Sequence, residues 1–543
     1  MKVIIIGSGL TALTAASYLA GMFHTEDSDT QKIQIELLSD GSGASPYVHG
    51  VNIPLHPKDT TEIFANDTKN SGYQLSKNEL VSALCEDSTL LMQDLASIGI
   101  ELEKKDGEYV LLKPLGSSFP RVASSSNHTG AEIMRKMQDF LISQPNVRCT
   151  KKARALRMNC QNGRIHGVLI WNEENNRMEY KQADAVLIAC GGFCGIYPFS
   201  TNSHDIGGDG IAMAYEAGLS LTDMEFVQFE PSVALYPESV RGKGMITTMF
   251  YEGAVLRNGE GKRFMPTECV GKDVLAKAIY REITSGIPTP HGGVYFDATA
   301  VGREKLLESY PSYVERYAQA GMNIAEEMFE IAPAPHTSLG GIVVNEHCES
   351  EMNGIFAAGE AIGGLHGANR LGGNAGLETL VFGKRAGVQI KQYLENLPNS
   401  AQNVQTENSV FELLTWAAQK KGTPLSGKQI LQYRQQMQEI LQKNLFVERN
   451  GYDLQSACEK IENMLQNVRA AACPEDAYHK IRLENDLICA NILAHSALAR
   501  EESIGCHIRT DAKEAPLNDR YHIVIRKELE NMKIEKQRLE GIG

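Results

Sequence analysis

The chain has 543 residues, of which 42% are hydrophobic and 22% charged, as in an ordinary globular protein of two to four domains. Its formal net charge of −14 excludes nucleic acid as a main partner, because such binding needs a basic surface. The eleven cysteines include no CxxC pair. We therefore expect reduced thiols, a cytoplasmic protein, and no metal or iron–sulfur site within this chain. No run of about 18 apolar residues predicts a membrane span.

The first predicted element is an apolar strand over residues 2–6, followed by the glycine-rich turn GSGLTA (residues 7–12) and a helix to Ala20. This order is typical of a dinucleotide site, because the glycines let the backbone approach a pyrophosphate that the helix N-terminus faces. A second strand over residues 33–38 ends at Ser39 and Asp40. Ser39 is expected to hold a ribose, with Asp40 as the alternative. The motif does not separate FAD from NAD.

The following segments alternate between helical and extended patterns. Helical periodicity runs from about residue 60 to residue 99, and another helix is expected to begin with Thr129 as its cap. Residues 147–170 alternate and contain Asn-Gly at 162–163, which predicts a hairpin. Residues 185–192 form a buried strand that ends on glycines, and this strand is expected to lie beside the first one.

The most unusual stretch is GGLHGANRLGGN (residues 363–374), which follows a short apolar strand that ends in Gly359-Glu360. Backbone of this kind lets a large flat group approach closely. His366 and Arg370 project from it. We predict that it carries a flavin on one side and a substrate carboxylate on the other.

Several segments together resemble the flavoprotein subunits of succinate dehydrogenase and fumarate reductase, a superfamily that also contains L-aspartate oxidase. They are residues 208–214, 223–231, 252–264, 336–341 and 359–383. The resemblance covers residue 3 to about residue 511. It implies an α/β fold in which a Rossmann-like FAD-binding domain (1–232 and 336–395) is interrupted by a capping α+β domain (233–335) and followed by a helical domain (396–515). The helical domain fits the apolar spacing of residues 430–441 and 454–465. Residues 516–543 form a charged tail, and from residue 512 onward strand and helix both remain open.

The same resemblance implies which residues hold FAD. They are Gly7, Gly9, Ser39, Ala44, His49, Gly50, Gly191, Asp209, Glu360, Asn374, Ala375 and Leu377. Ala44 falls near the histidine that tethers FAD covalently in succinate dehydrogenases. Alanine cannot form that bond, so non-covalent FAD is expected. His49 stands where the family has a glutamine next to the flavin. Whether His49 contacts the cofactor stays open.

Arg370 and His336 match the family residues that hold one substrate carboxylate. Arginine suits this task because its planar fork donates two parallel hydrogen bonds. The alternatives are an ion pair that fixes the glycine stretch for Arg370 and a satisfied buried histidine for His336.

Four other positions depart from the family pattern. Glu230 replaces a second substrate histidine, Lys272 replaces the arginine that shuttles a proton, and Thr247 and Phe250 replace the charged relay behind it. Lysine shifts its pKa readily, so Lys272 is a candidate proton donor or acceptor; the alternative is a solvated surface lysine. Glu230 would repel a dicarboxylate and suits an amine, a hydroxyl or an amide. Pro114 falls near a loop glutamate of the aspartate oxidases.

These residues predict an FAD-dependent oxidoreductase that transfers hydride between flavin N5 and a carbon adjacent to a carboxylate, on a substrate other than plain fumarate. Its partner would be an iron–sulfur or other electron-transfer subunit. Two alternatives stay open. One is an amino- or hydroxy-acid oxidase or dehydrogenase like L-aspartate oxidase, and the other is an electron-transfer subunit with a decayed substrate pocket. His366 is expected to contact the flavin or only to pack, and His507 and Arg509 are expected to be structural.

Overall fold

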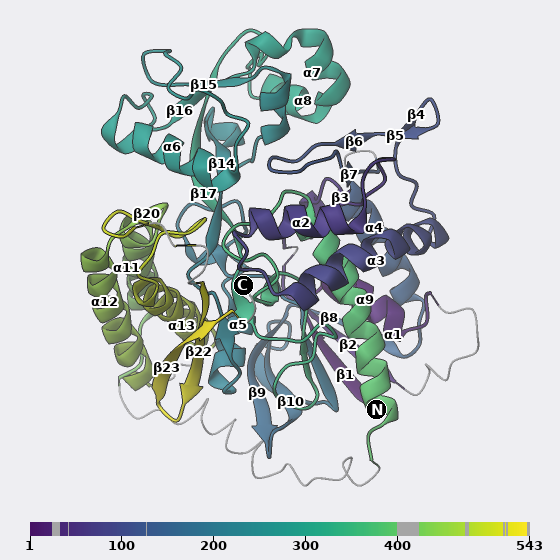
Figure 1. Cartoon of the computed structure of the whole chain (residues 1–543). Coiled ribbons are helices and arrows are strands. Elements are labelled where there is room, and N and C mark those ends of the chain that lie inside the picture. The colour runs from purple at the N-terminus through teal and green to yellow at the C-terminus, as the bar shows by residue number, and fades with distance from the viewer. Residues whose placement is uncertain are drawn as a thin grey trace.

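The computed structural model describes residues 1–23, 33–41, 43–125, 128–398, 423–472, 477–513, 516 and 520–539. Figure 1 shows three parts: a body around a parallel sheet, an upper part made by residues between β14 and β17, and a group of long helices at the side of the body. No helix within these ranges is long and apolar enough to cross a membrane.

The body is organised around a five-stranded sheet with the order β19-β12-β1-β2-β8, in which all pairings are parallel. Its strands are β1 (Lys2–Ile6), β2 (Gln34–Ser39), β8 (Val147–Lys151), β12 (Ala185–Ile188) and β19 (Ile355–Ala357). The apolar runs of β1, β12 and β19 suit a sheet that is covered on both faces, whereas the edge strand β8 is largely exposed. The prediction that the 185–192 strand returns beside the first one is confirmed, since Ile4 pairs with Val186.

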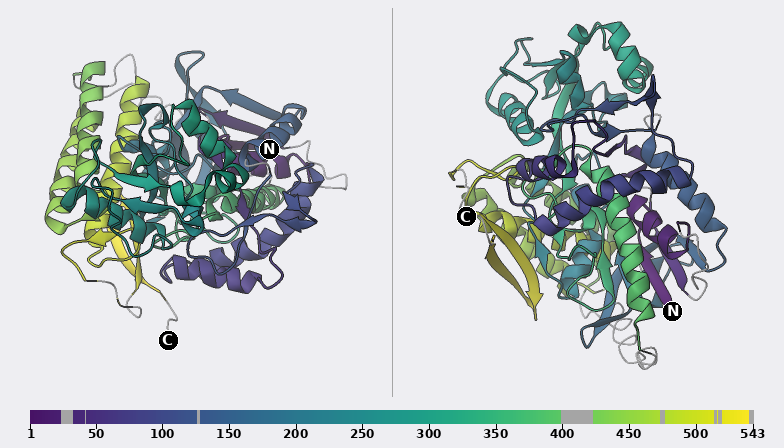
Figure 2. Two further views of the ribbon diagram at one scale, coloured as in Figure 1. Left: turned by 90° about the horizontal axis from the view of Figure 1, so that it is seen from above. Right: turned by 45° about the vertical axis from the view of Figure 1, so that its right-hand side comes forward.

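Helices α1 (Leu10–Leu19) and α9 (Asn374–Glu395) pack against each other, as Figures 1 and 2 both show. The predicted helical run over residues 60–99 is two helices, α2 (Thr61–Ser71) and α3 (Asn78–Ser97). Between them Tyr73 and Gln74 have φ angles of 58° and 57°, a left-handed conformation that ends a right-handed helix.

The prediction that Thr129 caps a helix is wrong. It is the first residue of α4 (Thr129–Ile142), and His128 occupies the cap position without a side-chain hydrogen bond. The Thr129 hydroxyl donates instead to the backbone oxygen of His49, and it accepts from Ser125 N. The Thr129 hydroxyl is therefore bonded to the loop around His49 and does not cap the helix.

An antiparallel sheet of β9 (Ala153–Gln161), β10 (Arg164–Asn172) and β11 (Arg177–Gln182) lies beside the parallel one. The hairpin predicted at residues 162–163 joins β9 to β10. Asn162 and Gly163 have φ angles of 51° and 71°, as the favoured two-residue turn requires.

The upper part is built on a sheet with the order β14-β17-β16-β15, and its core contains Phe296, Tyr317 and Phe329. Its strands are β14 (Val227–Tyr236), β15 (Val255–Arg257), β16 (Val294–Asp297) and β17 (Phe329–Ser338), and its helices are α6 (Lys272–Ser285), α7 (Arg303–Ser309) and α8 (Pro311–Gln319). The paired strands β14 and β17 run from this part down into the body (Figure 1). Residues on β14 and β17 can therefore face both parts.

The long helices at the side are α11 (Gly427–Asn444), α12 (Gly451–Ala470) and α13 (Ala477–Ala499). Of the predicted apolar faces, Tyr433 is only half-buried. The other residues are buried: Ile430, Met437, Leu441, Leu454, Cys458, Ile461 and Leu465. Helix α13 also contacts α5 (Asp209–Glu216) of the body.

The open choice for the C-terminal segment is resolved as strand. Strands β22 (Tyr521–Glu528) and β23 (Asn531–Arg538) form a hairpin that joins β13 (Leu221–Thr222) and β18 (Gly341–Ile342) in one sheet. The remaining short strands are β3 (Val51–Asn52), β4 (Lys104–Lys105), β5 (Glu108–Tyr109), β6 (Leu111–Leu112), β7 (Val122–Ala123), β20 (Glu448–Arg449) and β21 (Ile508–Arg509).

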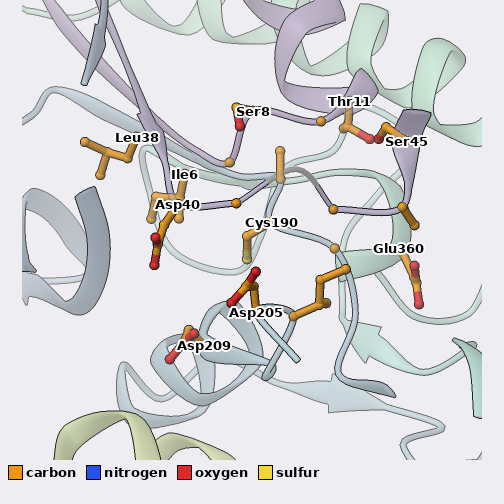
Figure 3. A pocket seen from close by; sticks show the side chains of 18 of the residues that line it. Ile6, Ser8, Thr11, Leu38, Asp40, Ser45, Cys190, Asp205, Asp209 and Glu360 are labelled. Atoms are coloured by element: carbon orange, nitrogen blue, oxygen red, sulfur yellow. The ribbon is translucent and has the colours of Figure 1, made fainter. Parts of the chain in front are cut away.

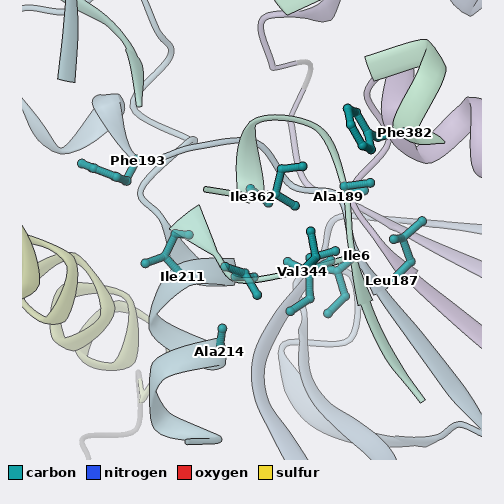
Figure 4. Packing of buried hydrophobic residues seen from close by; sticks show 14 of the residues in the cluster. Ile6, Leu187, Ala189, Phe193, Ile211, Ala214, Val344, Ile362 and Phe382 are labelled. Atoms are coloured by element: carbon teal, nitrogen blue, oxygen red, sulfur yellow. The ribbon is translucent and has the colours of Figure 1, made fainter. Parts of the chain in front are cut away.

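The main core lies beneath the glycine-rich turns. Figure 4 shows Ile6 and Leu187 from the parallel sheet, Ile211 from α5, Ile362 directly before the glycine stretch and Phe382 from α9 within one apolar cluster. All five are buried. Because these side chains come from segments far apart in the sequence, they fix the loops above them relative to the strand ends.

Candidate active site

A cavity opens where β1, β2 and β12 end, the edge at which ligands bind in parallel α/β sheets (Figure 3). Counted with the solvent-filled space at its mouth, its volume is about 1150 Å³. The predicted flavin residues that line it are Gly7, Gly9, Ala44, Gly191, Asp209, Glu360 and Ala375.

The first glycine turn has no room for side chains. Gly7 has a φ of 125°, and a Cβ atom there would lie 2.3 Å from the Ala189 oxygen. Gly9 precedes α1 without a side-chain cap, and the first turn of α1 carries no acid. The Ser45 hydroxyl accepts from Leu10 N at 2.9 Å. The positive end of the α1 dipole is therefore directed at the cavity and suits an anion.

Arg154 on β9 was not predicted from the sequence, yet it is the cation of this cavity. Its Nε donates to the carboxylate of Asp40 and its Nη1 to that of Asp209, both at 2.5 Å. Its Nη2 donates to the backbone oxygen of Asp205 at 3.1 Å. Burial acts to lower the pKa of Arg154, but the two carboxylates outweigh it and raise that pKa. Figure 3 shows the three aspartates on one side of the cavity and Glu360 on the other.

Ser39, the expected ribose ligand, is not among the residues that line the cavity. Its hydroxyl is 2.7 Å from that of Ser8, whereas Asp40 lines the cavity. At the far end, Glu360 accepts from Ser338 N at 3.0 Å, and burial raises its pKa to about 7.

The other predicted flavin residues lie around the cavity rather than in its wall. Asn374 accepts a hydrogen bond from Asn52 at 2.7 Å, and Leu377 and Gly50 are buried. The His49 Nε2 lies 3.1 Å from the Tyr313 hydroxyl, and the two rings stack at 5.9 Å. His49 therefore joins the body to α8 of the upper part.

Arg370 is buried, with an exposed fraction of 5%. Its Nη1 donates to the Leu371 oxygen at 3.3 Å, and its buried Nε has no partner. Within the described ranges no carboxylate lies within 4.0 Å of its guanidinium. The alternative, an ion pair between Arg370 and an acid that fixes the glycine stretch, is therefore not found. Gln228, which the sequence did not single out, holds its backbone by donating to the Arg370 oxygen at 2.9 Å and to Asn369 at 2.8 Å.

His336 lies on β17, and two residues that the sequence did not single out orient it. Its Nδ1 is 2.7 Å from the Thr201 hydroxyl, and its backbone oxygen accepts from Asn202 at 2.5 Å. Although 33% of its side chain is exposed, desolvation of the ring, followed by the charges of Lys272 and Arg370, lowers its pKa well below the usual value. The imidazole is therefore neutral at neutral pH.

Lys272 is not a surface lysine. It is the first residue of α6, and its ammonium group donates to the carboxylate of Glu230 on β14, in a pair whose side chains are 16% and 8% exposed. A cation at a helix N-terminus opposes the helix dipole. The same carboxylate lies 4.0 Å from His336 Nε2, so Glu230 lies close to both Lys272 and His336.

The remaining predicted positions carry no charge into this site. Thr247 begins a short 3₁₀ turn, and Phe250 packs against Phe296 with ring centroids 5.1 Å apart. The His366 Nε2 is hydrogen-bonded to Glu378, which lines the cavity. Pro114 lies next to Gly372.

His507 and Arg509 lie among residues of the C-terminal segments. The His507 ring is hydrogen-bonded to Arg449 and to the Arg500 oxygen, and Arg509 pairs with Asp511. These contacts agree with the structural roles that were expected. Within the described ranges, no group of three or more His, Cys, Asp or Glu residues is placed to hold a metal ion.

Comparison with known families decides the assignment. Residues 2–375 match the FAD binding domain family, and residues 434–540 match the fumarate reductase flavoprotein C-terminal family. The chain belongs to the succinate dehydrogenase and fumarate reductase flavoprotein family. The cofactor of this flavoprotein is FAD, and it is an oxidoreductase.

Its relatives extend over almost the whole chain. It is 30% identical to one subunit of the fumarate reductase (CoM/CoB) of Methanothermobacter marburgensis, over 97% of each chain. It is 27% identical to the L-aspartate oxidase of Synechocystis sp., over 96% of each chain. Among solved structures, FrdA of the E. coli quinol fumarate reductase aligns with a TM-score of 0.88 and 25% identity, covering 99% of this chain and 97% of that one.

The cavity fits FAD on its own chemistry. The glycine turn and the N-terminus of α1 suit a pyrophosphate, Asp40 suits a ribose hydroxyl, and the glycine stretch suits a flat ring system. Ala44, at the start of the turn Ser45–Tyr47, has no group that could bond to the ring.

We expect acid precipitation of the flavoprotein to release all of its FAD into the supernatant and to leave a colourless pellet. The reason is that the methyl group of Ala44 cannot form the covalent bond. Flavin absorbance in the washed pellet measures this, and a yellow pellet would show that another residue has formed a tether.

Replacing Arg154 with methionine is expected to strip most of the FAD during gel filtration. The variant leaves Asp40 and Asp209 without their shared cation, so two carboxylates would face a cofactor that is itself an anion. The ratio of flavin to protein absorbance measures the loss. Arg177→Met, at an exposed ion pair of the neighbouring sheet, is the matched control and should keep its flavin. Full flavin content in Arg154→Met would contradict the role given to Arg154.

Proposed function

We propose that this flavoprotein reduces, or in the reverse direction forms, a C–C double bond next to a carboxylate. Bound FAD would supply or accept the hydride. The observation that carries the proposal is Arg370, a buried cation without a carboxylate partner in the described part of the chain. Its charge and that of Lys272 act on His336, which lies 4.0 Å from the Lys272–Glu230 pair. A buried guanidinium in this state suits a substrate carboxylate, because the substrate then provides the missing charge.

Each polar group of the site has a task in this proposal. Arg370 binds the carboxylate in a forked pair, and His336, held by Thr201, donates a hydrogen bond from Nε2. Lys272 gives its proton to the carbon next to the one that receives hydride, or takes that proton away in the reverse direction. Glu230 holds the ammonium group of Lys272 in place, and the upper part that carries Lys272 covers the substrate.

The wider setting is proposed on the same basis. We place the domain boundaries at residues 232, 335, 395 and 515. Electrons would reach FAD from a separate electron-transfer subunit, for instance an iron–sulfur protein. The Methanothermobacter relative is itself one subunit of an enzyme. The ten cysteines of the described ranges are free thiols, which suits the cytoplasm.

A second candidate is oxidation of an amino or hydroxy acid. Glu230 favours it, because a carboxylate could face a substrate ammonium, and L-aspartate oxidases are among the relatives. The Lys272–Glu230 pair disfavours it, because Lys272 already occupies that carboxylate. An electron-transfer subunit with a decayed pocket is opposed by the buried polar groups, which cost stability when they have no use.

The test is anaerobic reoxidation of the reduced flavin by a panel of unsaturated acids, imino acids and oxygen. Flavin absorbance should return with at least one 2-enoate, and the saturated acid should appear in equal amount. Reoxidation by imino acids or oxygen alone would move the chain to the second candidate. If nothing in the panel reoxidised the flavin, the proposal would fail.

A further inference from the structure

The charged side chains around His336 indicate the charge of the substrate that the site can bind. The two cations whose charges act on this ring are Lys272 and Arg370. Lys272 is neutralised by Glu230, whereas Arg370 has no carboxylate within 4.0 Å in the part of the chain that the structure describes. The binding groups therefore hold one uncompensated positive charge.

Arg316 of α8 has no carboxylate within 4.0 Å in the described part of the chain either, but other groups hold its guanidinium. Arg316 lies with its guanidinium carbon 5.0 Å from the centre of the Tyr313 ring and donates to the Gly244 oxygen at 3.3 Å. Besides Glu230, the carboxylates whose charges act on Arg370 are those of Glu378 and Glu360. Any charge that they carry makes the site less positive.

The position of Glu230 decides what the second end of the substrate can be. Its carboxylate has an exposed fraction of 8% and lies 4.0 Å from His336 Nε2, so a group held by His336 also lies close to Glu230. A second carboxylate there would meet a fixed negative charge in a place where water cannot screen it. A neutral group that both donates and accepts hydrogen bonds could donate to the Glu230 carboxylate and form a hydrogen bond with the His336 imidazole.

We infer that the substrate is a monoanion: a 2-enoate, or its saturated acid, whose far end carries a neutral polar group such as an amide, and not a dicarboxylate. This inference rests on the proposed function and adds the substrate class. Arg370 takes the one carboxylate. The Lys272–Glu230 pair adds no net positive charge for a second carboxylate, and the Glu230 carboxylate repels one.

The test compares fumarate with its monoamide, and succinate with its monoamide, on the FAD-loaded protein. Binding is followed by the change in the absorption of the oxidised flavin, and turnover by anaerobic reoxidation of the reduced flavin. We expect the monoamides to be preferred by about tenfold or more. In Glu230→Gln the preference should reverse, because Lys272 is then a second free cation.

Two further variants distinguish an effect of charge on substrate binding from a loss of local structure. Lys272→Met combined with Glu230→Gln removes both charges, keeps the net charge of the site, and should still bind the monoamide better. Glu268→Gln removes another buried, ion-paired carboxylate of the upper part and should bind as the unaltered protein does.

Several results would overturn the inference: tighter binding of the dicarboxylate by the unaltered protein, equal binding of both, or an unchanged preference in Glu230→Gln. Failure of the proposed function looks different. In that case neither the monoamides nor the dicarboxylates would bind, and Arg370→Ala would behave as the unaltered protein.

Discussion

Replacing Arg370 with alanine is expected to abolish turnover while the flavoprotein keeps its fold and its FAD. The forked pair with the substrate carboxylate consists of two charge-assisted hydrogen bonds of about 1.5–3 kcal/mol each. Their loss corresponds to a fall in kcat/KM of roughly a hundredfold to ten-thousandfold. Steady-state kinetics with the best substrate of the panel measures it.

Stability should respond in the opposite way to activity. Arg370 has no ion pair to lose in the described structure, and burial, which outweighs the charges of Glu378, Glu230 and Glu360, lowers its pKa. The thermal midpoint of Arg370→Ala should therefore equal or exceed that of the unaltered protein. Arg385→Ala, which removes a paired arginine on α9, is the control and should keep its activity. Full turnover by Arg370→Ala would remove the basis of the proposed function.

Breaking the Lys272–Glu230 pair from one side is expected to destabilise the protein strongly. Lys272→Met leaves Glu230 buried without a cation, and removing one partner of a buried pair costs about 3–5 kcal/mol. The double variant Lys272→Met, Glu230→Gln removes both charges and should recover more than half of the lost thermal midpoint. Thermal unfolding at saturating FAD measures both variants against the unaltered protein.

The exposed pair Lys105–Glu308 provides the control for this cycle. Its side chains are 72% and 60% exposed, and such pairs contribute about 0–1 kcal/mol. Lys105→Met should leave the midpoint almost unchanged. If Lys272→Met were equally harmless, Glu230 would have another neutralising partner, and the charge balance derived for the site would be wrong.

The local features were predictable because short signals determine them. The turn GSGLTA, the hairpin at Asn162-Gly163 and the apolar faces of α11 and α12 each depend on residues close in sequence. Arg154 was missed because its contacts to Asp40 and Asp209 span 114 and 55 residues and come from a separate sheet. No local pattern marks an arginine of this kind.

The candidate substrate site was predicted as a set of residues but not as an arrangement. Resemblance to the family selected Arg370, His336, Glu230 and Lys272. Nothing in the sequence indicates that Lys272 and Glu230 neutralise each other, because that follows only from the packing of α6 against β14. The C-terminal hairpin could not be assigned either, since the mixed lysines and glutamates of residues 526–538 suit an exposed helix and an exposed strand equally.

The most direct test of the central claim is a single-turnover measurement on pre-reduced protein. The protein is mixed anaerobically with the best 2-enoate, and the return of oxidised-flavin absorbance is followed for the unaltered chain and for the double variant Lys272→Met, Glu230→Gln. We expect this variant to bind the acid normally but to be reoxidised roughly a hundredfold to ten-thousandfold more slowly, the usual contribution of a positioned proton donor. Equal rates in both proteins would contradict the role of Lys272, because the proton would then come from elsewhere.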